Sequence, residues 1–377
     1  MKIALFISNL PQEYIDLKNG NPGMGGTKYE MFLLAQLLES NKDFEFKLFL
    51  TSETKLCKKF EIVKGVLEAV EKADKEGFEV IIVKSSGLFA FLKEKHNIRV
   101  LLWCHNFLSP KQVLALNSKK NKTETEIICV SNEQKKILSS VLKTRKIYTV
   151  FNCFPNFNNY SESVVKEKAC CFVGSLTKDK HFDIAIKEFA KAYKKNNELK
   201  MYVIGDSNLY GYNKDAFKNS VFNYIKNNEL NDCIIFCGKM GLEKYDIINR
   251  CKLGIVNPDP TDETFCIAAL DYASCCVPIA CKNVNGLVDT TKNFSHCYYR
   301  KTTTIHKAIS KYLVEEKYLG LIVKSNFETY SVTNFLNSWK NVFAKKESDC
   351  KKLSFFKKII LASHYMLDRI KEKKYNV

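Results

Sequence analysis

The feature that most constrains the fold is a regular alternation of short apolar runs with longer amphipathic segments. In the first half the apolar runs predict strands at Ile3–Ser8, Phe44–Leu50, Val80–Val83, Val100–Cys104, Ile127–Val130 and Ile147–Phe151. Near-continuous apolar runs are typical of parallel strands that helices cover on both faces. Helical patterns lie between them, at Thr27–Glu39, Val63–Lys75, Leu88–Glu94 and Glu133–Leu142. The first half is therefore predicted to be a doubly wound parallel sheet.

The alternation stops after Pro155 and then begins again. Residues 156–168 are polar and predict a linker. Beyond it, strands are predicted at Ala169–Gly174, Lys200–Gly205, Cys233–Cys237, Leu253–Asn257, Pro278–Cys281 and Cys297–Arg300, with helices at Asp179–Lys195, Asp215–Asn227, Glu243–Asn249 and Asp262–Ser274. We therefore predict an α/β chain of two tandem Rossmann-like domains, 1–155 and 156–345, followed by a helical tail, 346–377. A length of 377 residues suits two such domains.

The composition limits which partners and which cell compartment we expect for this chain. Lys and Arg number 59 against 41 Asp and Glu, a net charge of +18 that favours anionic partners or gives a solvated basic surface. No recognised nucleic-acid module accompanies these lysines, so we expect no nucleic-acid partner. The 15 cysteines form no Cys-x-x-Cys pair and mostly lie in apolar runs, which predicts core thiols in a reducing, cytoplasmic compartment. No run of 18 apolar residues predicts a spanning helix.

A glycine-rich loop, residues 21–27, precedes the first predicted helix. Backbone N–H groups at a helix N-terminus bind anions, so Gly25 and Gly26 are candidates to hold a phosphate. The loop is not a dinucleotide fingerprint, because Lys28 stands where a third glycine would be needed. A plain glycine turn remains the alternative.

Two further candidates follow predicted strands. His105 ends the fourth strand, where active sites of open α/β sheets lie, and it would hydrogen-bond a substrate hydroxyl or orient a leaving group. A structural histidine is the alternative. The chain contains no Asp-x-Asp, so nothing supports a divalent ion beside a diphosphate, and we expect no metal or other cofactor. Lys180, which follows Gly174 and Ser175 closely, would neutralise a phosphate instead.

The most informative stretch runs from residue 257 to 271. A strand is predicted to end at Asn257 and a helix to begin near Asp262. Glu263 and Asp271 are eight residues apart, which on a helix places both carboxylates on one face. We expect them to hold hydroxyl groups of a ligand, with Asp262 capping the helix. An acidic cluster that only stabilises the helix N-terminus is the alternative.

These motifs together resemble those of the GT-B retaining glycosyltransferases of family 4, the group 1 nucleotide-sugar transferases. The resemblance runs from about residue 1 to 345. The matching features are the Glu-x7-Glu pair at Glu263 and Asp271, the Pro-Val and Gly-Gly-Leu-Pro-Glu segments at Pro278 and 284–289, the donor-phosphate motif at 172–180, the Gly-Gly loop at Gly25 and Gly26, and His105, Ser131 and Asn152 in place and order. It implies two Rossmann-like domains with a C-terminal helix that crosses back to the first.

The resemblance also implies roles for individual residues. His105 and Glu263 would be catalytic, with Glu263 on the sugar hydroxyls. The donor-binding set would be Gly25, Gly26, Gly174, Ser175, Lys180, Gly238, Lys239, Glu263, Thr264, Phe265 and Asp271. Lys180 would meet the diphosphate, Asp271 the ribose, and the backbone near Lys239 the base. Ser175 and Asp271 depart from the family's usual Arg and Glu, and His181 from its usual Gly.

The implied activity is transfer of a sugar from a nucleotide sugar to a glycan or lipid-linked acceptor, with retention at the anomeric carbon, in surface polysaccharide or glycolipid synthesis. A non-catalytic nucleotide- or sugar-binding relative is the alternative. The tail from Lys351 to Val377 carries a net charge of +6 and one apolar stripe, which predicts peripheral contact with an anionic membrane at its cytoplasmic face. Packing of the same stripe on the first domain is the competing interpretation.

Overall fold

The chain folds into two units. The computed structural model describes residues 1–8, 16–118, 123–142, 146–206, 214–314, 324–345, 361–363 and 365. Unit 1 comprises Met1–Asn19, Gly25–Cys153 and Thr329–Val377, and unit 2 comprises Gly20–Met24 and Phe154–Glu328. The change of unit after Cys153 lies close to the predicted boundary at 155. Residues 329–345, which the sequence assigned to the second domain, instead group with unit 1.

Unit 1 is a seven-stranded parallel sheet in the order β3-β2-β1-β4-β5-β6-β7. Its strands are β1 (Lys2–Ile7), β2 (Glu45–Leu50), β3 (Phe60–Ile62), β4 (Val80–Lys84), β5 (Arg99–Cys104), β6 (Thr125–Cys129) and β7 (Ile147–Thr149). Its helices are α1 (Gly26–Ser40), α2 (Val66–Lys75), α3 (Leu88–Phe91), α4 (Pro110–Asn117), α5 (Asn132–Val141) and α12 (Val332–Phe343), with short 3-10 turns η1 (Leu17–Asn19) and η2 (Ser85–Gly87).

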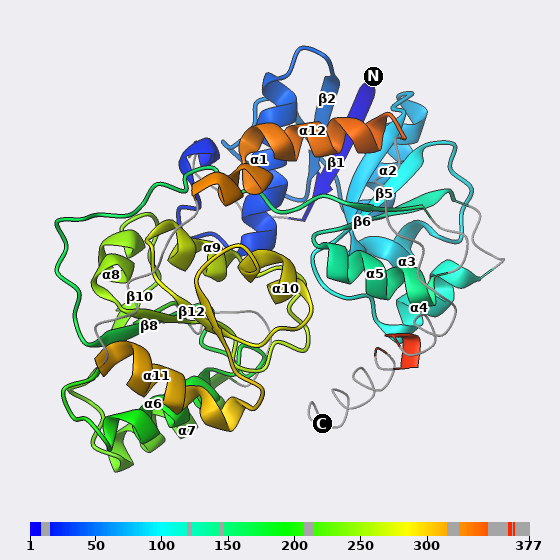
Figure 1. Cartoon of the computed structure of the whole chain (residues 1–377). Coiled ribbons are helices and arrows are strands. Elements are labelled where there is room, and N and C mark those ends of the chain that lie inside the picture. The colour runs from blue at the N-terminus through cyan, green and yellow to red at the C-terminus, as the bar shows by residue number, and fades with distance from the viewer. Residues whose placement is uncertain are drawn as a thin grey trace. The chain divides into compact units, whose positions relative to one another are not determined.

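Alternate residues of β5 show how the two faces of this sheet are covered. Val100, Leu102 and Cys104 join a core formed with α2 to α5. Trp103 points the other way and meets Trp339 of α12, with ring centroids 4.9 Å apart. Arg99 donates to the carbonyl oxygens of Val342 and Phe343 and pairs with Glu126, so a buried cation caps the C-terminus of α12. A helix near the C-terminus thus packs on the first domain, as the resemblance implies, but it is α12 and not the predicted tail helix at 346–377 (Figure 1).

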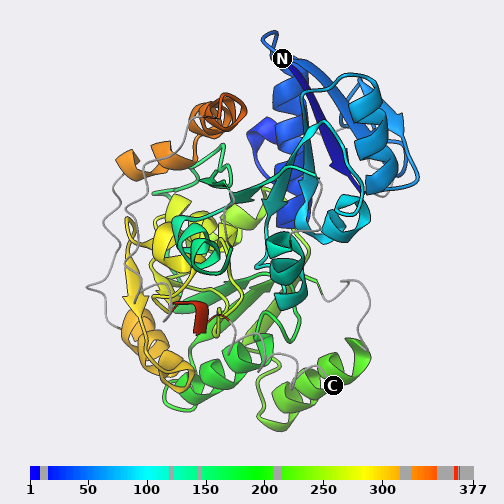
Figure 2. The same ribbon diagram turned by 90° about the vertical axis from the view of Figure 1, so that its right-hand side faces the viewer.

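Unit 2 is a six-stranded parallel sheet in the order β10-β9-β8-β11-β12-β13. Helices α6, α7 and α11 cover one face, and α8, α9 and α10 lie on the other; α6 and α7 stay below the strands in both views (Figures 1 and 2). The strands are β8 (Ala169–Val173), β9 (Lys200–Ile204), β10 (Ile234–Gly238), β11 (Leu253–Ile255), β12 (Ile279–Cys281) and β13 (His296–Tyr298). The helices are α6 (Phe182–Tyr193), α7 (Lys214–Asn227), α8 (Lys244–Arg250), α9 (Ile267–Ser274), α10 (Gly286–Thr291) and α11 (Ile305–Val314), with 3-10 turns η3 (Thr302–Thr304) and η4 (Lys324–Tyr330).

Each predicted strand is present within a few residues, and the predicted two-domain doubly wound fold is confirmed. The sequence missed β3, which has only three residues, and α4, which a Ser109 capping box and Pro110 begin. It also missed the helices α10 and α11 of unit 2. It also placed the start of α9 too early. The helix begins at Ile267 with no side-chain cap, so Asp262 does not cap it and Glu263 lies in the preceding loop.

The predicted amphipathic tail lies almost entirely outside the described residues. Within the described part, Tyr365 packs on Phe107 with ring centroids 6.1 Å apart, and its hydroxyl bonds the carbonyl oxygen of Leu108. This segment therefore contacts unit 1 just before α4. Among the described helices, none combines the length and the apolar character that crossing a bilayer demands.

Candidate functional site

Three neighbouring strands of unit 2 have a glycine at their carboxyl end: Gly174 directly follows β8, Gly205 directly follows β9, and Gly238 is the last residue of β10. The amide of Gly174 donates to the carbonyl oxygen of Ile204 at 3.0 Å, and that of Gly205 donates to Gly238 at 2.8 Å. At Gly205 φ is 152°, and a Cβ atom there would lie 1.8 Å from the carbonyl oxygen of Gly174. Only glycine fits that position, because the carbonyl of Gly174 occupies the space that a side chain would need, so the carboxyl edge of β8, β9 and β10 presents backbone without side chains at these three glycines. The sequence analysis singled out Gly174 and Gly238 and overlooked Gly205, although it follows a predicted strand.

Lys180 and Glu263, which were predicted to serve one donor, contact each other directly. Lys180 Nζ lies 2.7 Å from Glu263 Oε2, with side chains 35% and 11% exposed. Burial lowers the pKa of Lys180, but the charge of Glu263 and their hydrogen bond raise it further, so the net pKa lies above its usual value. The ammonium therefore stays charged, and it has three N–H donors, of which Glu263 needs one.

The neighbouring residue His181 fixes the loop that carries Lys180. His181 adopts a left-handed backbone conformation, with φ 50° and ψ 38°, at the N-cap of α6. This conformation suits glycine, which explains why the family motif usually has glycine there. The ring Nδ1 of His181 lies 2.9 Å from Oδ1 of Asn257, and Nδ2 of Asn257 donates to the carbonyl oxygen of Asp179 at 3.2 Å. Asn257 thus ties the Lys180 loop to the end of β11.

The loop that carries Glu263 is held from the opposite side. Nδ2 of Asn285 donates to the carbonyl oxygens of Pro260 and Thr261 at 3.2 and 2.7 Å, and the amide of Gly286 donates to Glu263 at 2.9 Å. These carbonyl oxygens are therefore engaged outside a helix, which is why α9 does not begin at Asp262. A Cβ atom on Gly286 would lie 2.1 Å from the carbonyl oxygen of Thr264, so the two segments touch backbone to backbone.

Asp271 is more enclosed than a ribose ligand was expected to be. Its Oδ1 lies 2.8 Å from Lys244 Nζ and accepts a hydrogen bond from the hydroxyl of Tyr245 at 3.0 Å. The two charged side chains are only 8% and 4% exposed. A buried carboxylate needs such partners, because leaving it unpaired is costly. Lys244 was not predicted: it is the first residue of α8 and belongs to no motif, so the sequence gave no signal for it.

The remaining donor-side candidates differ in exposure. The side chains of Thr264 and Phe265 are buried, whereas Ser175 is half-buried and Lys239 is exposed. Residues 20–24 pack against the loop after Lys239, since a Cβ atom on Gly23 would lie 2.9 Å from the carbonyl oxygen of Met240. The glycine-rich loop is therefore in contact with the segment predicted to meet the base.

The other candidates belong to unit 1. Gly25 is the N-cap of α1 and Gly26 its first residue. His105 is 7% exposed, its ring lies 4.4 Å from that of Trp103, and burial together with the nearby charge of Lys84 lowers its pKa to about 3. The imidazole is thus neutral at pH 7. Ser131 accepts from the amide of Gln134 at the start of α5, which is a structural role, and Asn152 is buried.

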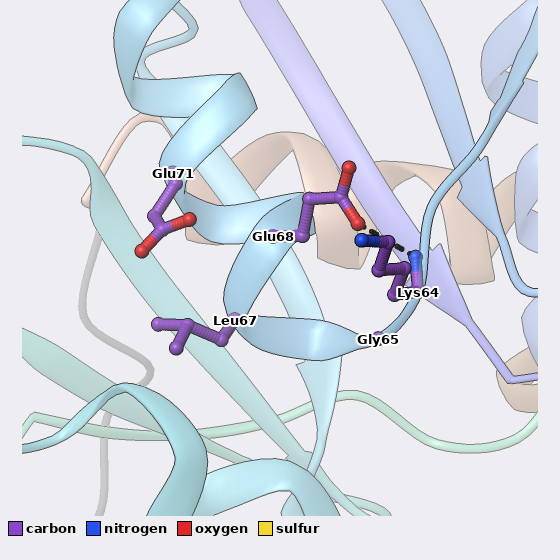
Figure 3. Close-up of a pocket in the computed structure, with 5 residues that line it drawn as sticks. All are labelled: Lys64, Gly65, Leu67, Glu68 and Glu71. Carbon is purple, nitrogen blue, oxygen red and sulfur yellow. Dashed lines mark hydrogen bonds between the residues drawn. The ribbon is translucent and has the colours of Figure 1, made fainter.

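The described residues contain no cluster of metal ligands, and the hollow at the start of α2 is lined by none of the predicted site residues. In the described ranges no three His, Cys, Asp or Glu side chains converge as ligands for an ion. A hollow of about 310 Å³ lies at the start of α2, where Glu68 accepts from the amide of Lys64 at 2.7 Å (Figure 3). The residues that line it are Lys64, Gly65, Leu67, Glu68 and Glu71, and none is a predicted site residue.

Comparison with known families bears on the part of the chain that holds Lys180, Glu263 and Asp271. Residues 155–324 match the model of the family described as glycosyl transferases group 1. This segment is a group 1 glycosyltransferase domain. The family resemblance seen in the motifs is therefore confirmed, and the transferase domain covers nearly all of unit 2.

Solved structures place the whole chain in the GT-B fold. HepE of Anabaena in complex with UDP-glucose has a TM-score of 0.68 at 15% identity, over 91% of this chain and 100% of that one. Sucrose-phosphate synthase from Thermosynechococcus elongatus gives 0.68 at 13% identity, over 91% and 98%. A glycosyltransferase from Rickettsia africae gives 0.63 at 12%, over 92% and 98%. No curated protein matches this chain.

Proposed function

We propose that this chain transfers a sugar, most simply a hexose, from a nucleotide-sugar donor to a glycan or lipid-linked acceptor, with retention of the anomeric configuration. The observation that carries the proposal is the Lys180–Glu263 pair, which lies in the matched family segment beside the bare strand ends. Synthesis of a surface polysaccharide or glycolipid is the role that such an activity would serve.

The chemistry explains why this pair suits the reaction. As the bond between the anomeric carbon and the diphosphate breaks, positive charge grows on the sugar ring and negative charge on the leaving phosphate. Lys180 can donate to the phosphate while one N–H remains on Glu263. A charge pair 4 Å apart in a partly wet site is worth about 4 kcal/mol. Glu263 in turn accepts hydrogen bonds from sugar hydroxyls.

Other residues complete the proposed assignment. The backbone at Gly174, Ser175 and Gly238 would face the donor, with Lys239 near the base. In unit 1 the amides of Gly25 and Gly26 would meet phosphate, and the neutral ring of His105 would bond a hydroxyl where sugar and acceptor join. Asp271 would reach the ribose only by sharing an oxygen that Lys244 and Tyr245 already contact.

We further propose that transfer needs no divalent ion, because Lys180 supplies the positive charge and the sequence has no Asp-x-Asp to hold a metal at the diphosphate. Lys180→Ala should weaken binding of a nucleoside diphosphate by about tenfold or more, about 1.4 kcal/mol. Activity should persist in EDTA. Complete loss on chelation, restored by magnesium or manganese, would contradict the metal-free mechanism.

The direct test is a screen of nucleotide sugars by thermal unfolding, because a bound donor stabilises the fold. Uridine diphosphate sugars come first, since the HepE structure holds UDP-glucose and a Staphylococcus aureus TarM structure holds UDP. The stabilising donor is then incubated with glycan and lipid-linked acceptors, and NMR coupling constants of the product report the anomeric configuration. Binding without transfer or donor hydrolysis would favour the alternative, a non-catalytic nucleotide- or sugar-binding relative.

Membrane contact through the basic tail is a separate proposal. Flotation with anionic and neutral vesicles, with and without residues 351–377, tests it. Equal and negligible binding in every case would reject the membrane contact and leave the transferase proposal in place.

A further inference from the structure

Lys84, the residue that ends β4 of unit 1, has no partner among the described residues. Lys84 is the last residue of β4 and pairs in register with Trp103 of β5, two residues before His105. Its side chain is half-buried, and in the described part of the chain its ammonium has no hydrogen bond or ion pair. Burial and the charge of Lys28 both lower its pKa. A half-buried charge that lacks a partner destabilises the free protein.

Lys28 adds to this excess of positive charge. It lies in the first turn of α1, which contains no acidic residue, and its side chain is also half-buried without a hydrogen bond or ion pair among the described residues. The N-terminus of a helix already carries a partial positive charge, so a cation there is unfavourable. Two lysines and a helix N-terminus therefore repel one another.

The topology places these groups where ligands bind in open α/β sheets. From β1 the chain adds β2 and β3 on one side of the sheet and then β4 and the later strands on the other side, so the strand order switches between β1 and β4. The crevice outside the carboxyl ends of the strands at such a switch point is the usual ligand site. Lys28 follows β1 through the glycine-rich loop, Lys84 ends β4, and His105 follows β5. The charge of Lys84 also acts on the ring of His105, so the two side chains are neighbours.

We propose that Lys28 and Lys84 form a subsite for a phosphate group of the acceptor, beside the ring of His105. A phosphate carries close to two negative charges, which would offset the charges of both lysines. The assignment to the acceptor rests on the proposed transferase function, whereas phosphate binding itself does not. Two of the lysines that contribute to the net charge of +18 would thus bind this phosphate.

The test measures binding of inorganic phosphate to the full chain by calorimetry at constant ionic strength, with UDP as a second ligand. Lys84→Met should weaken phosphate binding at least tenfold, Lys84→Arg should retain it, and Lys42→Gln, an exposed lysine at the opposite edge of the sheet, should have no effect. UDP affinity should be unchanged in Lys84→Met and reduced in Lys180→Ala. Circular dichroism and thermal unfolding confirm that each variant is folded.

Two outcomes would overturn the inference. Phosphate affinity that is equal in Lys84→Met and the parent chain would reject the subsite. Equal weakening of phosphate and UDP would assign the lysines to the donor's phosphates instead of the acceptor's. Since no step of this test requires sugar transfer, an inactive protein that binds phosphate through Lys84 would reject the transferase proposal and the assignment to an acceptor, and it would leave the phosphate subsite itself in place.

Discussion

The lysines at the carboxyl edges of the two sheets differ in whether they have an acidic partner. In unit 2, Lys180 pairs with Glu263 and Lys244 pairs with Asp271. In unit 1, Lys28 and Lys84 have no acidic partner among the described residues. An ion pair that the protein supplies itself stabilises the empty site, whereas unpaired charge stabilises only a complex with an anion. Unit 2 therefore has lysines whose charge the protein itself balances, and unit 1 has lysines whose charge the proposed phosphate would balance.

The two pairs of unit 2 also differ from each other in burial. Lys180 is 35% exposed and Glu263 11%, against 8% and 4% for Lys244 and Asp271. Water can reach the first pair, so a ligand can exchange with it at modest cost. The second is enclosed, so either partner left alone would be a buried, uncompensated charge. Four variants test these differences in burial and pairing, and the largest effect is expected at the buried pair.

Asp271→Asn should cause the largest loss of stability. It leaves the ammonium of Lys244 buried without a counter-charge, which typically costs about 3–5 kcal/mol of unfolding free energy. Urea unfolding measures it, with Asp183→Asn, which breaks the exposed pair with Lys187, as the matched control. The double variant Lys244→Met, Asp271→Leu should lose much less. If Asp271→Asn were as stable as its control and only lost donor affinity, Asp271 would be a ribose ligand and not a structural partner.

Glu263→Gln should act mainly on transfer and lower stability less than Asp271→Asn, because water can reach the ammonium of Lys180 when its partner loses the charge. The amide keeps the shape but loses the negative charge that the developing positive charge on the sugar would favour, so we expect turnover to fall by on the order of 10²-fold, about 2.7 kcal/mol. The measurement is steady-state transfer with the stabilising donor. Glu198→Gln breaks an exposed pair with Lys168 in the same unit and should transfer normally. Turnover of Glu263→Gln that matched this control would remove Glu263 from the site.

Acid should destabilise unit 1 through His105. Its pKa is about 3 in the folded chain and near 6.5 when unfolded, so between these values the unfolded chain binds the extra proton. Stability from this group is complete above pH 6.5 and declines by about 1.4 kcal/mol per pH unit as the pH falls toward 3. From pH 6.5 to 5 the loss is about 2 kcal/mol. Denaturant unfolding of the parent chain and His105→Gln over this range should give a steeper decline in the parent; parallel curves would contradict the buried neutral ring.

The smallest effect concerns the hydrogen bond between His181 and Asn257, which holds the loop that carries Lys180. His181→Asn should leave stability within about 0.5 kcal/mol, because asparagine tolerates the left-handed conformation and keeps an N–H donor for Asn257. His181→Ala keeps the strain and loses the hydrogen bond, which should cost about 1 kcal/mol. Thermal unfolding of the two variants side by side measures this. Equal melting temperatures would mean that the contact with Asn257 contributes nothing.

Periodicity alone was enough for the two sheets, because a parallel strand covered on both faces must be apolar throughout and the helices between must be amphipathic. It failed at β3, whose three residues are too few for a period, and at the start of α9. There the carbonyl oxygens of Pro260 and Thr261 bond Asn285, 24 or more residues later, and no local pattern reports such a contact.

The sequence by itself determined which residues could carry charge to a site and on which strand ends they stand. Lys180, Glu263 and His105 were all located from their order relative to the predicted strands. Only the tertiary structure decided which of those charges are paired: Lys180 with Glu263, Asp271 with Lys244, and Lys84 with no described partner. The physical reason is that pairing depends on distance and burial between segments far apart in the chain, 83 residues for the first pair, and sequence order does not encode them.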